Sequence, residues 1–136
     1  MIFRKKIIIM CLILLFSTSC CFNAGKRLGN NFQFIVDNRD FQVILYCNDY
    51  CCNSGTDAVP PKVVSYNYNS KWIIAKSYDR DKDSIYYWII DKDFKIEYDE
   101  HTDKKLKQQI IGNLDSVSFY KKLEELNINL KLRNVE

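Results

Sequence analysis

The sequence predicts an α+β fold, an antiparallel meander sheet of about five to six strands with one or two C-terminal helices packed on it. Two observations predict the sheet: apolar runs of strand length, rich in Trp, Tyr and Ile, recur along residues 32–98, and short polar stretches separate them. A third predicts the helices, because the apolar period lengthens to three or four residues after residue 101. Strands that follow one another after short turns favour antiparallel pairing over a βαβ arrangement.

The most informative stretch is residues 71–91, in which two apolar runs flank the polar segment at residues 79–83. We interpret this stretch as a β-hairpin. Every position from 85 to 90 is apolar, and alternate residues of a strand point to opposite faces, so both faces of the second strand are apolar. This pattern predicts a central strand that is covered on both sides, with Trp88 in the core.

Shorter patterns predict the remaining strands. Residues 32–36 and 41–47 form a predicted hairpin around turn-forming residues 37–40, and further strands are expected at residues 62–68 and 94–98, with a short edge strand at 128–132. Between them, residues 48–61 hold Asn, Asp, Ser, Gly and a Pro pair, which predicts one long irregular loop.

The C-terminal third predicts two helices. Thr102 is the expected N-cap of the first helix, which extends through Ile110 and stops at Gly112. Asp115 or Ser116 caps the second. Its apolar residues fall at helical spacing and predict a stripe that lies on the sheet: Phe119, Leu123 and Leu126.

The first 19 residues have the layout of a secretory signal: three basic residues at 4–6 and ten apolar residues at 7–16. The apolar run is shorter than the roughly 20 residues that span a bilayer. Residues 15–20, Leu-Phe-Ser-Thr-Ser-Cys, resemble a bacterial lipobox, although Ser17 stands where Leu is usual. The resemblance implies lipidation of Cys20, for example with palmitate, with the adjacent Cys21 as the alternative acceptor. We therefore expect a lipoprotein signal peptide at 1–19, a flexible tether at 20–31 and one domain at 32–136.

Removal of 19 of the 136 residues leaves 117, enough for one domain with a real hydrophobic core. The signal carries three of the 20 basic residues, so 17 basic residues face 17 acidic ones in the mature chain. Proteins that bind nucleic acid usually carry a net basic domain or stripe. This neutral balance predicts no nucleic-acid partner.

A second resemblance rests on the patterns Pro60-Pro61-x-Val-Val-x-Tyr66-x-Tyr68, Trp-Ile-Ile-Ala-Lys at 72–76 and Tyr-Trp-Ile-Ile-Asp at 87–91. The chain resembles a family of short bacterial lipoproteins of unknown function over about half of its mature length. The resemblance implies export to the cell envelope and a sheet with a C-terminal helix. It implies no catalytic residue and no cofactor.

Cys47, Cys51 and Cys52 are candidates for a disulfide. In the oxidising conditions of an exported chain, Cys47 can pair with Cys51 or Cys52, whereas adjacent cysteines rarely pair with each other. With His101 the three thiols could instead bind zinc, but their spacing lacks the paired CxxC elements of structural zinc sites. Free thiols are the third alternative. We favour the disulfide and predict no metal.

No stretch predicts catalysis. Residues 79–83 resemble the first half of a calcium loop, but Ser84 stands where that motif needs Gly and Ile90 where it needs Glu, so we interpret them as a solvated hairpin tip. His101, the single histidine, has no recognisable nucleophile motif with it. We therefore expect no enzyme; the alternative is a hydrolase with no recognisable motif.

Four tyrosines near the long loop are the predicted binding surface: Tyr46, Tyr50, Tyr66 and Tyr68. The sequence thus favours a membrane-tethered interaction module that binds an unidentified envelope protein through this surface. The alternative is an inhibitor or immunity-type protein that blocks an envelope enzyme.

Overall fold

The computed structural model describes residues 25–38, 40–93 and 99–136, which form two antiparallel sheets and two helices. The first sheet is a meander in chain order: β1 (Lys26–Gly29), β2 (Phe32–Asn38), β3 (Phe41–Cys47) and β4 (Gly55–Val59). The second sheet has the order β8-β7-β6-β5-β9, with β5 at Val63–Tyr68, β6 at Trp72–Asp79, β7 at Ser84–Asp91, β8 at Ile110–Leu114 and β9 at Arg133–Asn134. The helices are α2 (Thr102–Gln108) and α3 (Ser116–Glu125).

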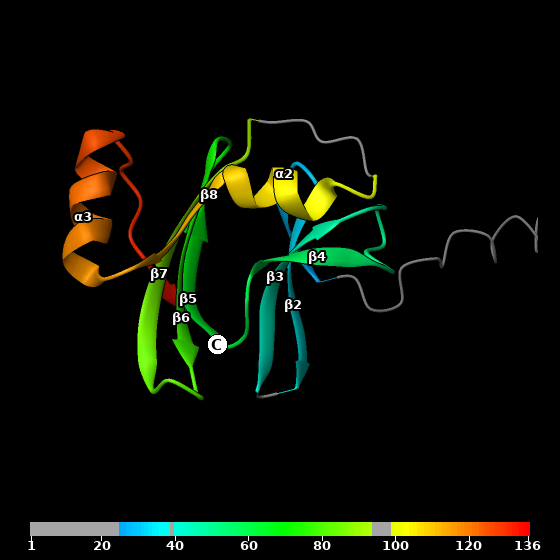
Figure 1. The fold of residues 1–136 in the computed structure, drawn as a ribbon, viewed down its shortest axis with the longest axis horizontal. Helices are drawn as coiled ribbons and strands as arrows, with labels where there is room; N and C mark the ends of the chain where they lie inside the picture. The colour runs from blue at the N-terminus through cyan, green and yellow to red at the C-terminus, as the bar shows by residue number, and fades with distance from the viewer. Residues whose placement is uncertain (1–24, 39, 94–98) are drawn as a thin grey trace, which may run out of the picture.

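These elements form three layers, in which the two sheets face each other and α3 covers the far side of the second sheet (Figure 1). Side chains from both sheets and Leu106 of α2 share the core between the sheets. A second cluster joins α3 to the second sheet and contains Ile74, Ile89, Phe119, Leu123 and Ile128. The second sheet is therefore apolar on both faces, and α2 lies across one end of the space between the sheets (Figure 1).

The predicted α+β class, with antiparallel strands and C-terminal helices, is confirmed. The strands are divided between two sheets where the sequence suggested one. Pro60 and Pro61 lie between the last strand of the first sheet and the first strand of the second. Proline has no backbone N–H to donate, so a strand ladder does not continue through this pair.

The predicted hairpin at residues 71–91 is confirmed as β6 and β7. Its pairing is regular over eight residue pairs, from Trp72 with Asp91 to Asp79 with Ser84. Trp88 faces the core between the sheets with 9% of its surface exposed, and its indole N–H donates to Ser77 Oγ at 2.8 Å. The prediction that this strand is covered on both faces, with Trp88 in the core, is therefore correct.

The hairpin predicted around residues 37–40 is confirmed as β2 and β3, but the tether predicted at 20–31 contains a strand in its second half. There β1 pairs with β2, and Leu28 is buried in the core. Gly29, Asn30 and Asn31 all have positive φ, which glycine and asparagine tolerate best, and they form the turn into β2. Residues 1–24, with the predicted signal and Cys20, lie outside the described residues.

The irregular loop predicted at residues 48–61 is also shorter than expected, because β4 lies inside it and pairs with β3. Ala58 and Val59 are buried there. The apolar part of β4 is only these two residues, since Gly55, Thr56 and Asp57 precede them, so the strand carries no alternating pattern of useful length.

The first predicted helix is present, but Thr102 is its first helical residue and not its N-cap, so the predicted cap is wrong, and the helix ends two residues early. Ile110 starts β8, which pairs with β7, and Gly112 lies inside this strand against the Trp88 ring instead of ending a helix. The pairing of β8 with β7 outweighs the local helical spacing of Leu106 and Ile110. The N-cap position is His101, whose side chain makes no capping hydrogen bond.

The second predicted helix is confirmed as α3, capped by Asp115, whose carboxylate accepts from the Ser118 N–H at 2.7 Å. Its apolar stripe lies on the second sheet, as predicted. The edge strand predicted at 128–132 is displaced to β9, and the strand predicted at 94–98 lies outside the described residues. Neither described helix is long and apolar enough to cross a membrane.

Candidate functional site: a cleft between the two sheets

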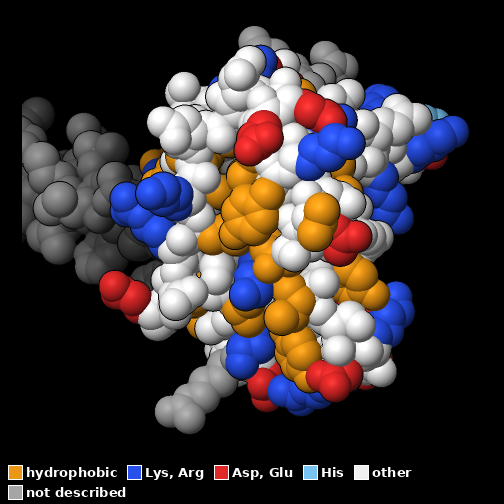
Figure 2. Space-filling view, turned by 90° about the vertical axis from the view of Figure 1, so that its left-hand side faces the viewer, with side chains coloured by type: hydrophobic (Ala, Val, Ile, Leu, Met, Phe, Trp, Pro, Cys, Tyr) orange, Lys and Arg blue, Asp and Glu red, His pale blue; other side chains and the backbone are white. Residues whose placement is uncertain are grey.

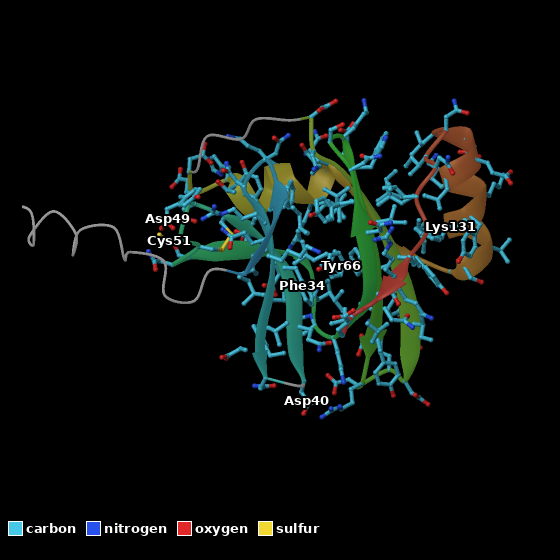
Figure 3. All side chains as sticks on the ribbon, turned by 180° about the vertical axis from the view of Figure 1, so that it is seen from behind. Phe34, Asp40, Asp49, Cys51, Tyr66 and Lys131 are labelled. Atoms are coloured by element: carbon cyan, nitrogen blue, oxygen red, sulfur yellow. A yellow bond between two sulfur atoms is a disulfide. The ribbon has the colours of Figure 1, made fainter. Side chains whose placement is uncertain are left out.

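A cleft of about 1320 Å³ opens between the two sheets along the side where β1, β2, β5 and β9 lie. Phe34 of β2 and Tyr66 of β5 point toward each other across this space (Figure 3). The lining comes from five strands, β1, β2, β3, β5 and β9, and from the residues that flank them. It comprises Gly25, Lys26, Phe34, Ile35, Val36, Asp37, Phe41, Tyr66, Asn67, Tyr68, Leu130, Arg133, Asn134, Val135 and Glu136.

Aromatic side chains form the floor of the cleft. The rings of Phe34 and Tyr66 have centroids 4.5 Å apart and an interplanar angle of 33°. Phe34 is nearly buried and Tyr66 is half-buried, whereas Val36 and Phe41 at the rim are 54% and 39% exposed. A concave surface that combines an aromatic floor with polar groups around it is a usual form of a binding site.

Two cations line the same cleft beside Tyr66. Lys26 Nζ lies 5.9 Å from the centroid of the Tyr66 ring and 5.6 Å from that of Tyr68, and Arg133 is the cross-strand partner of Tyr66. Neither cation forms an ion pair with another residue of the described part of the chain. Asp37 and Glu136 also line the cleft, so it offers groups of both charges to a ligand.

Burial raises the pKa of the Tyr66 hydroxyl above its ordinary value, and the neighbouring Tyr68 raises it further. The phenol therefore stays protonated at neutral pH. A protonated phenol can donate a hydrogen bond to a ligand carbonyl or carboxylate in the cleft.

The four tyrosines predicted as one surface are separated by the structure. Tyr66 and Tyr68 line the cleft. Tyr46, in contrast, is a core residue with 2% exposure, and the centroid of its ring lies 5.1 Å from that of Phe32. The prediction for Tyr46 is wrong because successive side chains of β3 point to opposite faces of the sheet, and Tyr46 is on the face that packs against the other sheet. Tyr50 is 68% exposed in the loop after β3 and does not line the cleft.

A disulfide closes the base of the Tyr50 loop. The pairing predicted between Cys47 and Cys51 or Cys52 is resolved in favour of Cys52, and Cys51 does not join Cys47. The Arg27 guanidinium lies over the Tyr50 ring, 3.3 Å from its centroid, and donates to the hydroxyl. Gln33 Nε2 donates to the Tyr50 carbonyl at 3.0 Å. The loop is therefore fixed onto β1 and β2.

The polar segment at residues 79–83 is a hairpin tip, as interpreted from the sequence. Asp79 Oδ1 accepts hydrogen bonds from the N–H groups of Asp81 and Lys82, so this carboxylate stabilises the turn. Arg80 Nη2 lies 2.6 Å from Asp40 Oδ1 at the tip of the β2–β3 hairpin, which links the two sheets. No group of three or more metal-ligating side chains lies among the residues that the structure describes.

His101 does not line the cleft. It is exposed at the start of α2, and its Nε2 lies 3.4 Å from Glu100 Oε1. The nearby Asp99 has a pKa lowered chiefly by its hydrogen bond with Lys105. These contacts stabilise the helix start and bring no nucleophile to the histidine.

A second apolar surface lies on the α3 side of the molecule, where hydrophobic side chains form a stripe (Figure 2). Its most exposed members are Ile85, Val117 and Tyr120. A hollow of about 850 Å³ lies between α3 and residues 127–132. It carries fewer polar groups than the inter-sheet cleft.

No family model, curated protein or solved structure matches this chain. Sequence reasoning missed Lys26, Phe34 and Arg133 because Lys26 lay in the predicted tether and Arg133, far away in the chain, meets the other two only through the sheet topology. The Gly29-Asn30-Asn31 turn was the one sequence signal that could have placed Lys26 in a strand beside the site.

Proposed function

We propose that the protein is an exported, lipid-anchored binding module of the bacterial cell envelope, without enzymatic activity, that holds a partner protein in the inter-sheet cleft. One observation carries the proposal: aromatic rings from two sheets converge on one open cleft beside Lys26, which forms no ion pair within the part of the chain that the structure describes. Such a mixture of apolar floor and polar rim is typical of protein interfaces.

The position of β1 supports a membrane-proximal partner. If Cys20 carries the lipid, only six residue steps separate it from Lys26 at the start of β1. A fully extended chain of six residues spans about 20 Å. Lys26, at one end of the cleft lining, would therefore lie within about 20 Å of the membrane surface. The cleft would then be within reach of the membrane-proximal parts of other envelope proteins.

The test is site-specific photo-crosslinking of the full-length protein in its native membrane. A photoreactive phenylalanine analogue replaces Phe41, which is exposed at the rim of the cleft, and in a matched control it replaces Val117, which is 78% exposed on α3. We expect a discrete crosslinked species from position 41 and none from position 117. Equal crosslinking at both positions, or none at position 41, would refute the cleft as the binding site.

The crosslinked partner also separates the proposed module from its alternative. Several envelope proteins captured at position 41 would indicate an adaptor. A single enzyme captured in stoichiometric amount, and inhibited by the purified domain, would indicate an inhibitor or immunity-type protein.

A further inference from the structure

The C-terminal residues 131–136 form an extended strap, and residues 133–136 of this strap line one side of the cleft. The strap runs antiparallel along β5: Arg133 pairs with Tyr66 and Asn134 pairs with Ser65. The Val135 N–H donates to the Val64 carbonyl at 3.1 Å. At its other end, Asn67 Nδ2 donates to the Lys131 carbonyl at 2.8 Å.

The two faces of the strap have different surroundings. Leu132 packs in the cluster beneath α3, whereas Val135 packs against the core between the sheets, and Arg133 lines the cleft. Ser65 Oγ donates to Asn134 Oδ1 at 3.0 Å. The strap therefore shows, within this molecule, how an extended peptide fits the edge of β5: backbone pairing with Ser65 and Tyr66, and one aliphatic side chain between the sheets.

The last four residues are weakly held by comparison with the other strands. Only Arg133 and Asn134 form regular strand pairs, whereas β6 and β7 share eight. Arg133, Asn134 and Glu136 are exposed, and Val135 is only half-buried. A short, exposed edge strand of this kind can be replaced by a competing strand that makes the same backbone hydrogen bonds.

We infer that the edge of β5 is a strand-exchange site, at which an extended segment of a partner protein displaces residues 133–136 and pairs with Ser65 and Tyr66. This inference rests on the proposed function and names its ligand class, an extended peptide. The peptide carries an aliphatic residue at the position of Val135, which lies between the sheets. The residue two positions before this aliphatic residue takes the place of Arg133, so its side chain lies beside Tyr66. The strap itself acts as an internal competitor for the site.

The probe for this inference is a fluorescent peptide with the strap sequence of residues 131–136, measured by fluorescence anisotropy. The protein is compared with a variant that ends at Leu132, after a two-dimensional NMR spectrum has shown that the variant keeps its fold. We expect the truncated protein to bind the peptide at least tenfold more tightly than the intact protein does. A control peptide with Val135→Lys should bind at least tenfold more weakly. Equal binding to both proteins, or no binding to the folded truncated protein, overturns the inference.

A locked variant tests the same inference without truncation. Ser65→Cys with Asn134→Cys places two thiols on cross-strand partners whose side chains already touch, a geometry that suits a disulfide. The locked protein should not bind the strap peptide, and each single-cysteine variant should bind as the intact protein does. Locked protein that binds as well as the single variants contradicts strand exchange.

The locked variant also separates this inference from the proposed function. If crosslinking at position 41 captures the same partner in equal amount from locked and unlocked protein, the cleft is the binding site but the strap is not displaced. If position 41 captures nothing, the proposed function itself fails. Loss of the crosslink only in the locked protein supports both.

Discussion

Phe34 and Tyr66, 32 positions apart in the chain, bring the two sheets together with ring centroids 4.5 Å apart in the floor of the cleft. Each ring lies on the inner face of its own strand, and the contact exists only because the chain turns from one sheet into the other between β4 and β5. The same contact thus holds the two layers together and forms the surface that we propose for binding.

This pair predicts a measurable coupling between the sheets. In a double-mutant cycle with Phe34→Leu and Tyr66→Leu, urea unfolding should give a coupling energy of about 0.5 to 1.5 kcal/mol, the usual value for an aromatic pair. The matched control is Phe41→Leu with Tyr66→Leu, since Phe41 is exposed at the rim. A coupling of the control pair as large as that of Phe34 with Tyr66 would show that the ring contact is not its source.

Trp88→Ala should lower the free energy of unfolding by about 3 to 5 kcal/mol, because the truncation leaves a cavity between the sheets and removes the hydrogen-bond donor of the buried Ser77 hydroxyl. Trp88→Phe keeps most of the buried area and should cost less. Gly112→Ala tests the same packing from the neighbouring strand β8, because the added Cβ would lie 2.2 Å from the Trp88 ring and crowd it. A Trp88→Ala protein that melts within about a degree of the parent would contradict this core position.

The sequence predicted the parts of this fold that local pattern determines. The hairpin of β6 and β7 is long and apolar, and α3 has both a cap at Asp115 and a stripe that includes Phe119. Such features need no knowledge of distant residues. The interior position of Trp88 followed from the apolar residues on both faces of its strand.

Pairing between distant segments was beyond local pattern. Ile110 fits a helix by spacing, but its backbone pairs with β7, and the short strands β1 and β4 become stable only against β2 and β3. The cleft could not be predicted for the same reason: its rings, Phe34 and Tyr66, lie in different sheets, and its cation Arg133 is far from both in the chain. Tyr46 shows the reverse error, because proximity to the long loop in sequence did not expose it.

The bridge between Cys47 and Cys52 closes a small ring with a sequence separation of 5. Replacing both residues by Ala should therefore cost only about 2 kcal/mol, at the low end for a disulfide. The larger effect should be local, since the bridge holds the loop in which Tyr50 contacts Arg27. Peptide mapping of protein isolated with its thiols blocked checks the pairing, and alkylated Cys47 would refute it.

Cys20→Ala should release the protein from the membrane and abolish metabolic labelling with fatty acid. We expect this result because two or three acyl chains, which are typical of bacterial lipoprotein anchors, hold a protein stably at a membrane, whereas one chain holds it only marginally. Cys21→Ala is the matched control and should retain both label and membrane attachment. Label that persists in Cys20→Ala and disappears in Cys21→Ala would move the acceptor to Cys21.

Lys92 gives the clearest prediction for pH. Its side chain is almost fully buried, with Nζ donating to the Leu28 carbonyl at 2.5 Å and lying 5.6 Å from the centroid of the Tyr68 ring. Gly29 makes room for it, since a Cβ there would lie 2.9 Å from Nζ. Burial lowers the pKa of Lys92, and the charge of Asp93 only partly opposes this shift.

A lowered pKa means that between this pKa and about 10.5 the unfolded chain binds a proton at Lys92 that the folded chain does not. Stability should therefore rise with pH through that window, and at neutral pH the buried charge costs the fold free energy. Lys92→Met removes the charge while keeping much of the volume. We expect the stability of the parent relative to this variant to increase from pH 7 to pH 10.5, by about 1.4 kcal/mol for each unit by which the pKa is lowered. Urea unfolding of both proteins across this range measures the difference, in which the other titrating groups cancel. A constant difference would show that Lys92 keeps its ordinary pKa, and a decrease would show that the folded protein stabilises the charged form.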